Sequence, residues 1–269
     1  MDRSVRQDMN DAATTAAPWI ERFARFGYAS KGVVYTIIGA LAAATAFGLG
    51  GTRGDSAAAF RFIREQPFGR TLLIIVAVGL LGYAAWRIIS AISDAEDHGA
   101  DAKGFAIRGG SFFRGVVYVF LAFGAIQLAR GGSGSAGGDQ NAQNWTARLM
   151  DAPFGRWLAV LVGAGIAGYG VYQLVRAWKS KLGKQLRTRK LVGVCRFGIA
   201  ARAVVFLFIG FSIARAAWQL DPSEAQGTSG ALKEIASYSE WLFVAIAVGL
   251  VAYGVYQFVN ARYRVIDAT

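Results

Sequence analysis

A pair of basic residues six positions apart occurs three times in the sequence, each time at the start of a long apolar run. The pairs are Arg25/Lys31, Arg108/Arg114 and Arg196/Arg202. We treat all six side chains as candidates for an anion or lipid-headgroup site, because charge-assisted hydrogen bonds to phosphate are strong. Under three-fold symmetry, the second members of the pairs would form a basic ring near the membrane surface. The alternative is that these residues only anchor the helices at the interface.

Aromatic residues recur beside these pairs. Tyr35, Tyr118 and Phe206 each lie four positions after a residue of the basic ring. This helical spacing permits a cation–π contact. A second aromatic signature closes each repeat: Tyr83/Trp86, Tyr169/Tyr172 and Tyr253/Tyr256. This aromatic stripe is typical of an interfacial belt, and the alternative interpretation is a ligand cage. Arg87, Gln173 and Gln257 follow the stripe and could hydrogen-bond between hairpins.

Arg215 is a charge that only the third repeat carries, since the aligned residues are Gln127 and Ala44. Charged residues within an apolar run are candidates for a functional or paired role. Glu240 opens the last apolar run from the same side of the membrane. We therefore predict a salt bridge between Arg215 and Glu240, with Glu234 as the alternative partner.

The other reactive side chains form no pattern that indicates catalysis. The chain has one histidine, His98, and one cysteine, Cys195, which excludes a histidine-built metal site and an internal disulfide. Ser56, Ser133 and Ser135 lie in glycine-rich loops, but no histidine is expected on their side of the membrane. We therefore expect a protein that is not an enzyme and that holds no metal or cofactor.

Six apolar runs must position these residues, at approximately 32–50, 70–92, 114–130, 157–178, 199–219 and 241–260. Each has about 17–23 residues, enough for a helix to cross a hydrocarbon core of ~30 Å. A membrane β-barrel needs alternating polarity, and the run from Leu72 to Gly82 does not alternate. The composition agrees with this interpretation, because only 17% of the residues are charged and 54% are hydrophobic.

The runs pair into three tandem hairpin repeats, 19–93, 104–180 and 191–264, preceded by a tail, 1–18, that we expect to be disordered. Because each repeat contains two spans, the repeats enter the membrane in the same direction and suit a pseudo-three-fold arrangement. Amphipathic segments that begin near Asp55, Asp139 and Thr228 predict short helices in the outer interface. The predicted fold is an all-α polytopic membrane protein with six transmembrane helices.

The formal net charge of +12 is explained by topology. With both termini on one side, that side holds 20 of the 29 Lys and Arg residues, and the richest stretch runs from Arg176 to Arg202. The positive-inside rule then places both termini in the cytoplasm. Attraction to anionic lipid accounts for the basic balance, and a nucleic-acid partner is not required.

The triplicated pattern Arg-x5-Lys/Arg-Gly/Ala-Val-Val-Tyr/Phe, with Gly/Ala-Tyr at the end of each return helix, resembles a bacterial family. That family is catalogued as domain of unknown function 1206, and its members carry three hairpin repeats and six spans. The resemblance covers nearly the whole chain after about residue 20, although the third repeat departs at Ala203, Phe206 and Glu240. It implies a bacterial inner-membrane protein, with no established activity to transfer.

Two classes of function remain open on the sequence. The first is a non-catalytic envelope protein that binds membrane lipids, which we expect to be anionic, or a protein partner or a second copy of the chain. The alternative is a small channel or transporter with a pathway along the pseudo-three-fold axis. Polar side chains along the whole axis would favour the channel, and a packed apolar axis would favour the binding protein.

Overall fold

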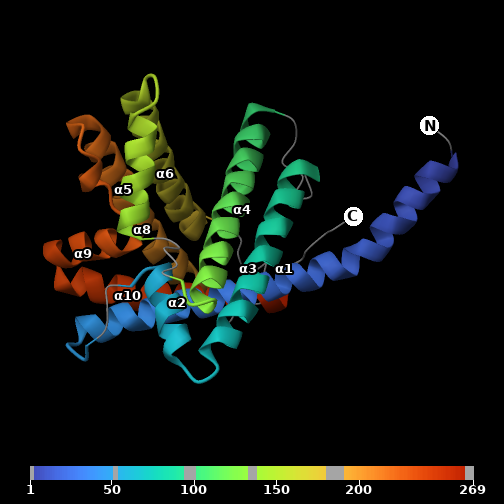
Figure 1. Ribbon diagram of the computed structural model, residues 1–269, viewed down its shortest axis with the longest axis horizontal. Coiled ribbons are helices and arrows are strands. Elements are labelled where there is room, and N and C mark those ends of the chain that lie inside the picture. Colours follow the sequence, from blue (N-terminus) through green and yellow to red (C-terminus); the bar gives the residue numbers. More distant parts are fainter. Residues whose placement is uncertain (1–2, 51–53, 94–100, 133–137, 180–190, 264–269) are drawn as a thin grey trace.

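The computed structural model of the protein describes residues 3–50, 54–93, 101–132, 138–179 and 191–263, and it is helical throughout (Figure 1). The long helices are α1 (Arg3–Ala46), α3 (Gly69–Ser93), α4 (Ala102–Ala129), α6 (Gly155–Lys179), α8 (Val192–Gln219) and α10 (Glu240–Tyr263). The connections hold α2 (Ser56–Glu65), α5 (Asp139–Met150), the 3-10 turn η1 (Pro222–Glu224) and α9 (Thr228–Tyr238). Within the described residues, six helices are long and apolar enough to cross a membrane, so the prediction of six spans is confirmed.

The first helix extends further than the sequence analysis predicts. Residues 3–18, which we expected to be disordered, form the beginning of α1. This segment is rich in alanine, which has the highest intrinsic helix propensity, and it continues into the first span. In Figure 1 this part of α1 projects away from the other helices.

Helices of different repeats pack in three equivalent pairs: α3 with α4, α6 with α8, and α10 with α1. Glycine permits the same close approach in each pair. A Cβ atom added at Gly115, Gly170 or Gly254 would lie 3.1, 2.9 or 2.9 Å from a carbonyl oxygen of the facing helix. Small residues at one depth allow membrane helices to approach closely, because lipid provides no hydrophobic drive for their association. The pair of α10 and α1 joins the third repeat to the first, so all three repeats are linked.

Within a hairpin, the two spans pack in the first and third repeats. In the first repeat, a Cβ at Gly27 would meet the backbone of Tyr83, and one at Gly79 would meet Ser30. The third repeat makes the equivalent contacts, from Gly198 to Tyr253 and from Gly249 to Ala201. These glycine contacts therefore define the interface between the two spans of a closed hairpin.

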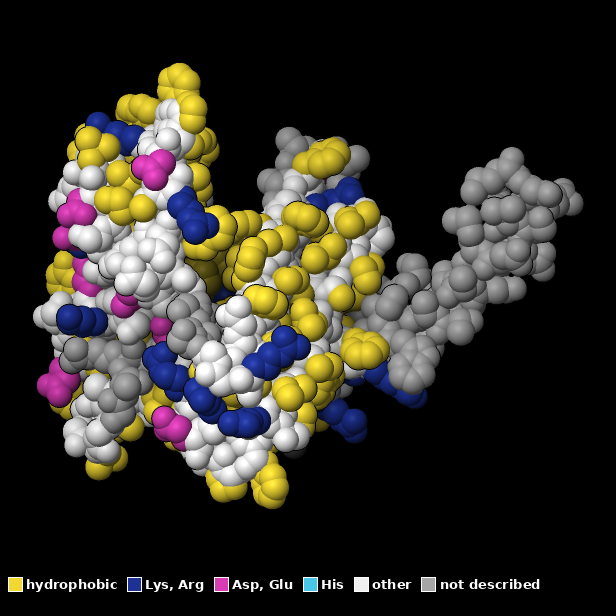
Figure 2. Space-filling model, in the orientation of Figure 1, with side chains coloured by type: hydrophobic (Ala, Val, Ile, Leu, Met, Phe, Trp, Pro, Cys, Tyr) yellow, Lys and Arg dark blue, Asp and Glu magenta, His cyan; other side chains and the backbone are white. Residues whose placement is uncertain are grey.

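The second hairpin is open, and this opening lies between α4 and α6. Nothing described lies within 4 Å of a Cβ placed on Gly110 or Gly165, which align with the packed glycines of the other repeats. Figure 2 shows a hollow at this place, between the part of the molecule that carries α4 and the part that carries α6. Phe113 stands where the closed hairpins have Ser30 and Ala201, and we attribute the opening to this residue. Its ring is too large for that interface, and 61% of the residue is exposed.

The three short helices occur where they are predicted, but they do not all lie on the surface. Phe60 and Ile63 of α2 and Leu232 and Ile235 of α9 are buried in the core of the bundle. In α5, which belongs to the second repeat, only Thr146 is buried. The side of the molecule that carries these helices is called the outer side below, and the opposite side the inner side.

Candidate functional site

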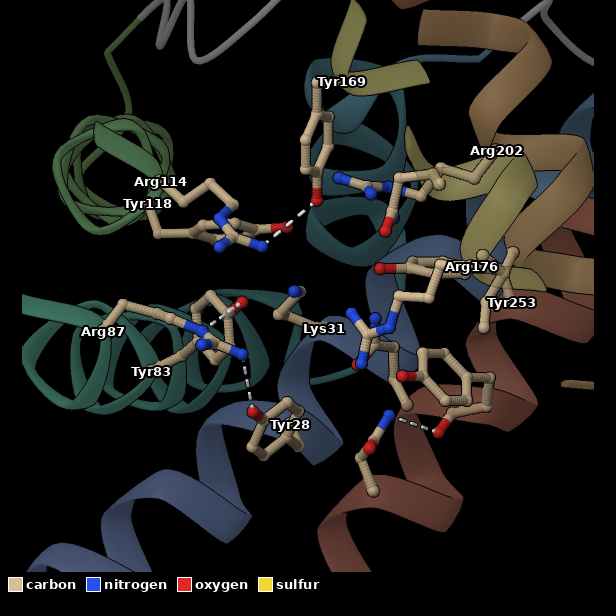
Figure 3. A pocket seen from close by; sticks show the side chains of 15 residues that line it. Tyr28, Lys31, Tyr83, Arg87, Arg114, Tyr118, Tyr169, Arg176, Arg202 and Tyr253 are labelled. Carbon is tan, nitrogen blue, oxygen red and sulfur yellow. Dashed lines mark hydrogen bonds between the residues drawn. The ribbon is translucent and has the colours of Figure 1, made fainter. Parts of the chain in front are cut away.

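A cavity of about 30 Å³ lies where the inner halves of the three repeats meet (Figure 3). Five cationic residues, each from a different helix, line it: Lys31, Arg87, Arg114, Arg176 and Arg202. This volume is the space open to the centre of a water-sized sphere, and one water molecule needs about 10–15 Å³ of it. The cavity therefore has room for about two waters or for the oxygens of one small anion.

The cavity brings together the three residues of the predicted basic ring. Lys31 of α1 is 3% exposed and Arg202 of α8 is 6% exposed, whereas Arg114 of α4 is half-buried. Each lies one residue before the Gly or Ala at which the helix approaches its neighbour closely. The close inter-repeat packing therefore holds three equivalent cations at one depth.

The two other cations occupy two different positions of the repeat, and at each position only one of the three repeats carries a charge. Arg87 aligns with Gln173 and Gln257, and Arg176 aligns with Ser90 and Asn260. They follow the return-helix tyrosines by four and seven residues, which places them on the same helical face as those tyrosines. The role of Arg176 is not apparent from the sequence, because a comparison of the repeats selects residues that all three repeats share.

No acidic side chain is among the described residues that line the cavity. Taking a charge out of water costs several kcal/mol unless an opposite charge or a set of hydrogen bonds compensates it. Several cations around one small space also repel one another, and this repulsion is strong at low dielectric constant. The arrangement is therefore suited to an anion, which would offset both terms.

Aromatic rings join neighbouring repeats around the cavity in three equivalent edge-to-face pairs. The ring centroids are 4.7 Å apart for Tyr83 and Tyr118, 5.6 Å for Tyr169 and Phe206, and 4.7 Å for Tyr253 and Tyr35. Edge-to-face pairs contribute about 0.5–1.5 kcal/mol beyond the area that they bury. The two aromatic signatures of the sequence thus meet across each boundary between repeats and form a rigid frame for the cations.

We expected each cation to contact the aromatic residue four positions later on its own helix, but most of the observed contacts are with other helices. Lys31 Nζ lies 3.8 Å from the ring centre of Tyr83 and 4.6 Å from that of Tyr118. Arg114 lies over the ring of Tyr169 and donates a hydrogen bond to its hydroxyl at 3.2 Å. Only in the third repeat does the cation contact the aromatic residue four positions later, with Arg202 4.3 Å from the ring of Phe206. Lys31 and Arg114 instead contact the return-helix rings of Tyr83 and Tyr169, and Arg202 also reaches the return-helix ring of Tyr253, at 4.9 Å.

Hydrogen bonds from the cavity side chains fix the positions of two more cations. Arg202 donates from Nε to the Tyr35 hydroxyl at 2.9 Å, which links the third repeat to the first. Arg87 donates to the hydroxyls of Tyr83 and Tyr28, both at 3.1 Å and both within the first hairpin. The Tyr35 hydroxyl is uncharged, so it does not neutralise the positive charge of Arg202.

Two amide groups in the cavity wall also have unused hydrogen-bonding capacity. Gln173 and Gln257 are 5% and 2% exposed, and no group of the described residues donates to their Oε1 atoms. Buried polar groups without a partner are rare in folded proteins. The assignment of O and N in a glutamine amide can be exchanged. Each group is therefore able to accept from or donate to a bound ligand.

Comparison with known proteins supports the repeat structure independently. Three regions of the chain, residues 26–94, 109–180 and 197–264, match the family described as Domain of Unknown Function (DUF1206). The chain belongs to this family. It is similar to "Uncharacterized protein YxxB" of Bacillus subtilis (strain 168), with 34% identity over 257 residues that cover 92% of each chain. No solved structure matches the chain.

The first members of the triplicated basic pairs are outside the lining of this cavity. Arg25 donates to the carbonyl oxygens of Ala261 and Arg262, at the end of α10. Arg108 donates in the same way to the carbonyl oxygens of Ala91 and Ile92, at the end of α3. The last carbonyls of a helix have no partner within the helix, and basic side chains satisfy them favourably. Arg25 and Arg108 therefore connect neighbouring repeats, and neither of them lines the cavity.

The remaining candidates divide between cavity, core and surface. Arg196 is exposed on α8 and does not line the cavity. Tyr256 lines the cavity with the three signature tyrosines, whereas Trp86 is buried in the apolar core and Tyr172 is 51% exposed. A uniform interfacial belt would expose all of them to a similar degree. Four of the six stripe residues therefore line the cavity, and Trp86 and Tyr172 do not.

Arg215 forms ion pairs at the outer side, but not with Glu240. Its Nη2 atom lies 2.8 Å from a carboxylate oxygen of Glu224, and its Nη1 atom lies 3.7 Å from Glu234. The turn η1 brings Glu224 back over the end of α8, and Glu234 lies on the following helix, α9. Glu240 is the first residue of α10. The predicted pair with Glu240 is therefore wrong, and the alternative with Glu234 fits.

Some candidate residues lie outside the described residues, namely His98, Ser133 and Ser135. Within the part of the chain that the structure describes, no group of His, Cys, Asp and Glu side chains is arranged to hold a metal ion. Cys195 is buried on α8 as a free thiol.

Proposed function

We propose that this membrane protein is a non-catalytic binding protein that holds an anionic, phosphate-type group in its central cavity. The observation that carries the proposal is the lining of the cavity, with five cationic residues and no acidic residue among those described. Guanidinium groups match the geometry of phosphate oxygens and form charge-assisted hydrogen bonds with them. Three of the cations come from equivalent positions of three repeats, which supports a site built by the fold itself.

The packing on the outer side favours a binding site over a channel. Leu73 and Leu80 of α3 and Ile246 and Leu250 of α10 are at most 3% exposed. They belong to one apolar core with the buried residues of α2 and α9. A pathway along the axis would need polar groups or water through this half as well. The polar cavity with an apolar outer half supports an anion that enters and leaves on the inner side or from the membrane.

The proposal includes the placement of the protein in the bacterial inner membrane with both termini in the cytoplasm. The excess of basic residues on the inner side supports this orientation through the positive-inside rule. Fusions of alkaline phosphatase at positions 98, 185, 135 and 226 test it. We expect activity at 135 and 226 only, and activity at 98 or 185 would reverse the orientation.

Thermal unfolding in detergent tests the anion site. Delipidated protein is titrated with inorganic phosphate or with dihexanoyl phosphatidic acid, at constant ionic strength maintained by chloride. A ligand at 100 times its Kd adds about 2.7 kcal/mol to the stability of the folded state, which raises Tm by several degrees. We expect Arg202→Gln to lose this increase and Arg148→Gln, an exposed change on α5, to keep it. No increase with either probe, or an equal increase in both variants, would contradict the proposal.

A further inference from the structure

The opening between α4 and α6 leads directly to the cationic cavity. Arg114 of α4 and Tyr169 of α6 both line the cavity, and the hydrogen bond between them crosses the opening at 3.2 Å (Figure 3). Both side chains are half-buried, unlike the fully buried Tyr83 and Tyr253 of the closed hairpins. The cavity is therefore closed by packed helices towards the first and third hairpins and only by a polar contact towards the second.

Apolar side chains form the walls of this opening. On α4 they include Phe113 and Phe120, which are 61% and 59% exposed. On α6, Leu161 is 68% exposed and lies one helical turn from Gly165, on the same face. The two glycines of that face, Gly165 and Gly168, have nothing described within 4 Å of an added Cβ, so the space beside them is free. The opening thus combines apolar walls within a predicted span with positive charges at its inner end.

We infer that this opening is a lateral portal for one anionic phospholipid, whose phosphate enters the cavity while its acyl chains lie between α4 and α6. The inference rests on the proposed function, because it names the source of the anion. Charge complementarity favours a lipid over a partner helix, since an apolar helix would fill the walls but leave the cavity cations without an anion. The volume of about 30 Å³ fits the phosphate group itself and favours a lipid with a small headgroup.

Four variants separate the portal from the cavity. Gly165→Trp fills the opening at a position with free space and leaves the cavity residues in place. Val171→Trp is the matched control, because Val171 lies on the same helix, is 52% exposed and points about 120° away from Gly165. Arg202→Gln removes a cation from the cavity. Gly168→Trp repeats the block at the next position of the opening, in case Gly165→Trp does not fold as a monodisperse protein.

Native mass spectrometry measures lipid retention after incubation in vesicles of phosphatidylcholine and phosphatidylglycerol. We expect one phosphatidylglycerol per wild-type chain, an unchanged retained fraction in Val171→Trp, and a loss of at least five-fold in Gly165→Trp or Gly168→Trp and in Arg202→Gln. The thermal shift with inorganic phosphate should persist in the two glycine variants. Equal lipid retention in the glycine variants and Val171→Trp would overturn the portal.

The outcomes also separate this inference from the proposed function. A thermal shift with phosphate but no lipid retained by the wild type would assign the cavity to a soluble anion and overturn the portal alone. Absence of both signals would overturn both proposals. A protein complex that Gly165→Trp dissociates, without retained lipid, would show that a partner helix occupies the opening.

Discussion

The second hairpin and its two neighbours have almost the same pattern of glycines but different packing. In the first and third hairpins, Gly79 and Gly249 face Ser30 and Ala201, and the two spans touch. In the second hairpin, the aligned Gly165 would face Phe113, and the two spans separate. The comparison teaches that small residues on one helix are not sufficient for close packing. We infer that the facing residue must also be small, and that one aromatic side chain at this position, Phe113, keeps the two spans apart.

The packing between repeats is preserved on both sides of this opening. The pairs α3/α4 and α6/α8 hold the two spans of the second hairpin to the first and third repeats, respectively. The opening therefore does not interrupt the frame of edge-to-face aromatic pairs around the cavity. In a membrane protein of three repeats, one repeat can thus provide access to the central cavity while the other two stabilise the fold.

The largest effect should come from substituting the aligned glycines. Gly79→Leu and Gly249→Leu insert a side chain between packed spans, and overpacking of this kind costs about 1–3 kcal/mol. This corresponds to a fall in Tm of roughly 3 to 10 °C for a protein of this size. Gly165→Leu should not lower Tm, because free space lies beside it and leucine has a higher helix propensity than glycine. Thermal unfolding in detergent compares the three variants, and an equal loss in all of them would show that the second hairpin is closed.

A second change should close the opening. Phe113→Ser gives α4 the residue that the first hairpin has at this position, so α4 and α6 should approach to the distance of packed helices, about 8–10 Å between axes. Pulsed electron resonance between spin labels at positions 123 and 157, with Cys195 replaced by serine, measures the approach. Phe112→Ser is the control, since Phe112 is a neighbouring exposed phenylalanine aligned with Ala29. Distances that Phe113→Ser does not shorten, or that both changes shorten equally, would exclude Phe113 as the cause.

The fold could be predicted from the sequence because its main signals are local or repeated. The length of each apolar run determines a span, and the repeat offsets determine the hairpins. The opening could not be predicted in this way, because it depends on how Phe113 meets Gly165 across two helices. The alignment of Phe113 with Ser30 and Ala201 was nevertheless visible in the sequence and is the signal that could have revealed it.

The candidate site was predicted in part for the same reason. Lys31, Arg114 and Arg202 stand out because they recur, and the structure brings them to one cavity. Arg87 and Arg176 each occur once, so only their helical register relative to the return-helix tyrosines links them to the cavity. Arg25 and Arg108 cap the ends of helices in neighbouring repeats. This role could not be predicted, because it depends on how the repeats pack and no local sequence pattern gives that packing.

The smallest effect concerns the outer end of the third hairpin, where the second hairpin has Gln127 in place of Arg215. Arg215 and Glu224 are 32% and 42% exposed, so solvent screens their attraction and the coupling should be about 0.5–1 kcal/mol. A double-mutant cycle of Arg215→Gln and Glu224→Gln, followed by thermal unfolding, measures it. The same cycle with Glu240→Gln should show no coupling. A coupling with Glu240 larger than that with Glu224 would contradict the geometry.

The central claim is that an anion occupies the cavity and that its lipid chains occupy the opening of the second hairpin. The most direct measurement is a crystal structure from a lipidic mesophase doped with phosphatidylglycerol whose acyl chains carry bromine. The account predicts density for a phosphate group in contact with Lys31, Arg114 and Arg202, and anomalous signal from bromine between α4 and α6. An empty cavity with α4 packed on α6, or bromine distributed evenly around the outside of all six spans, would contradict it.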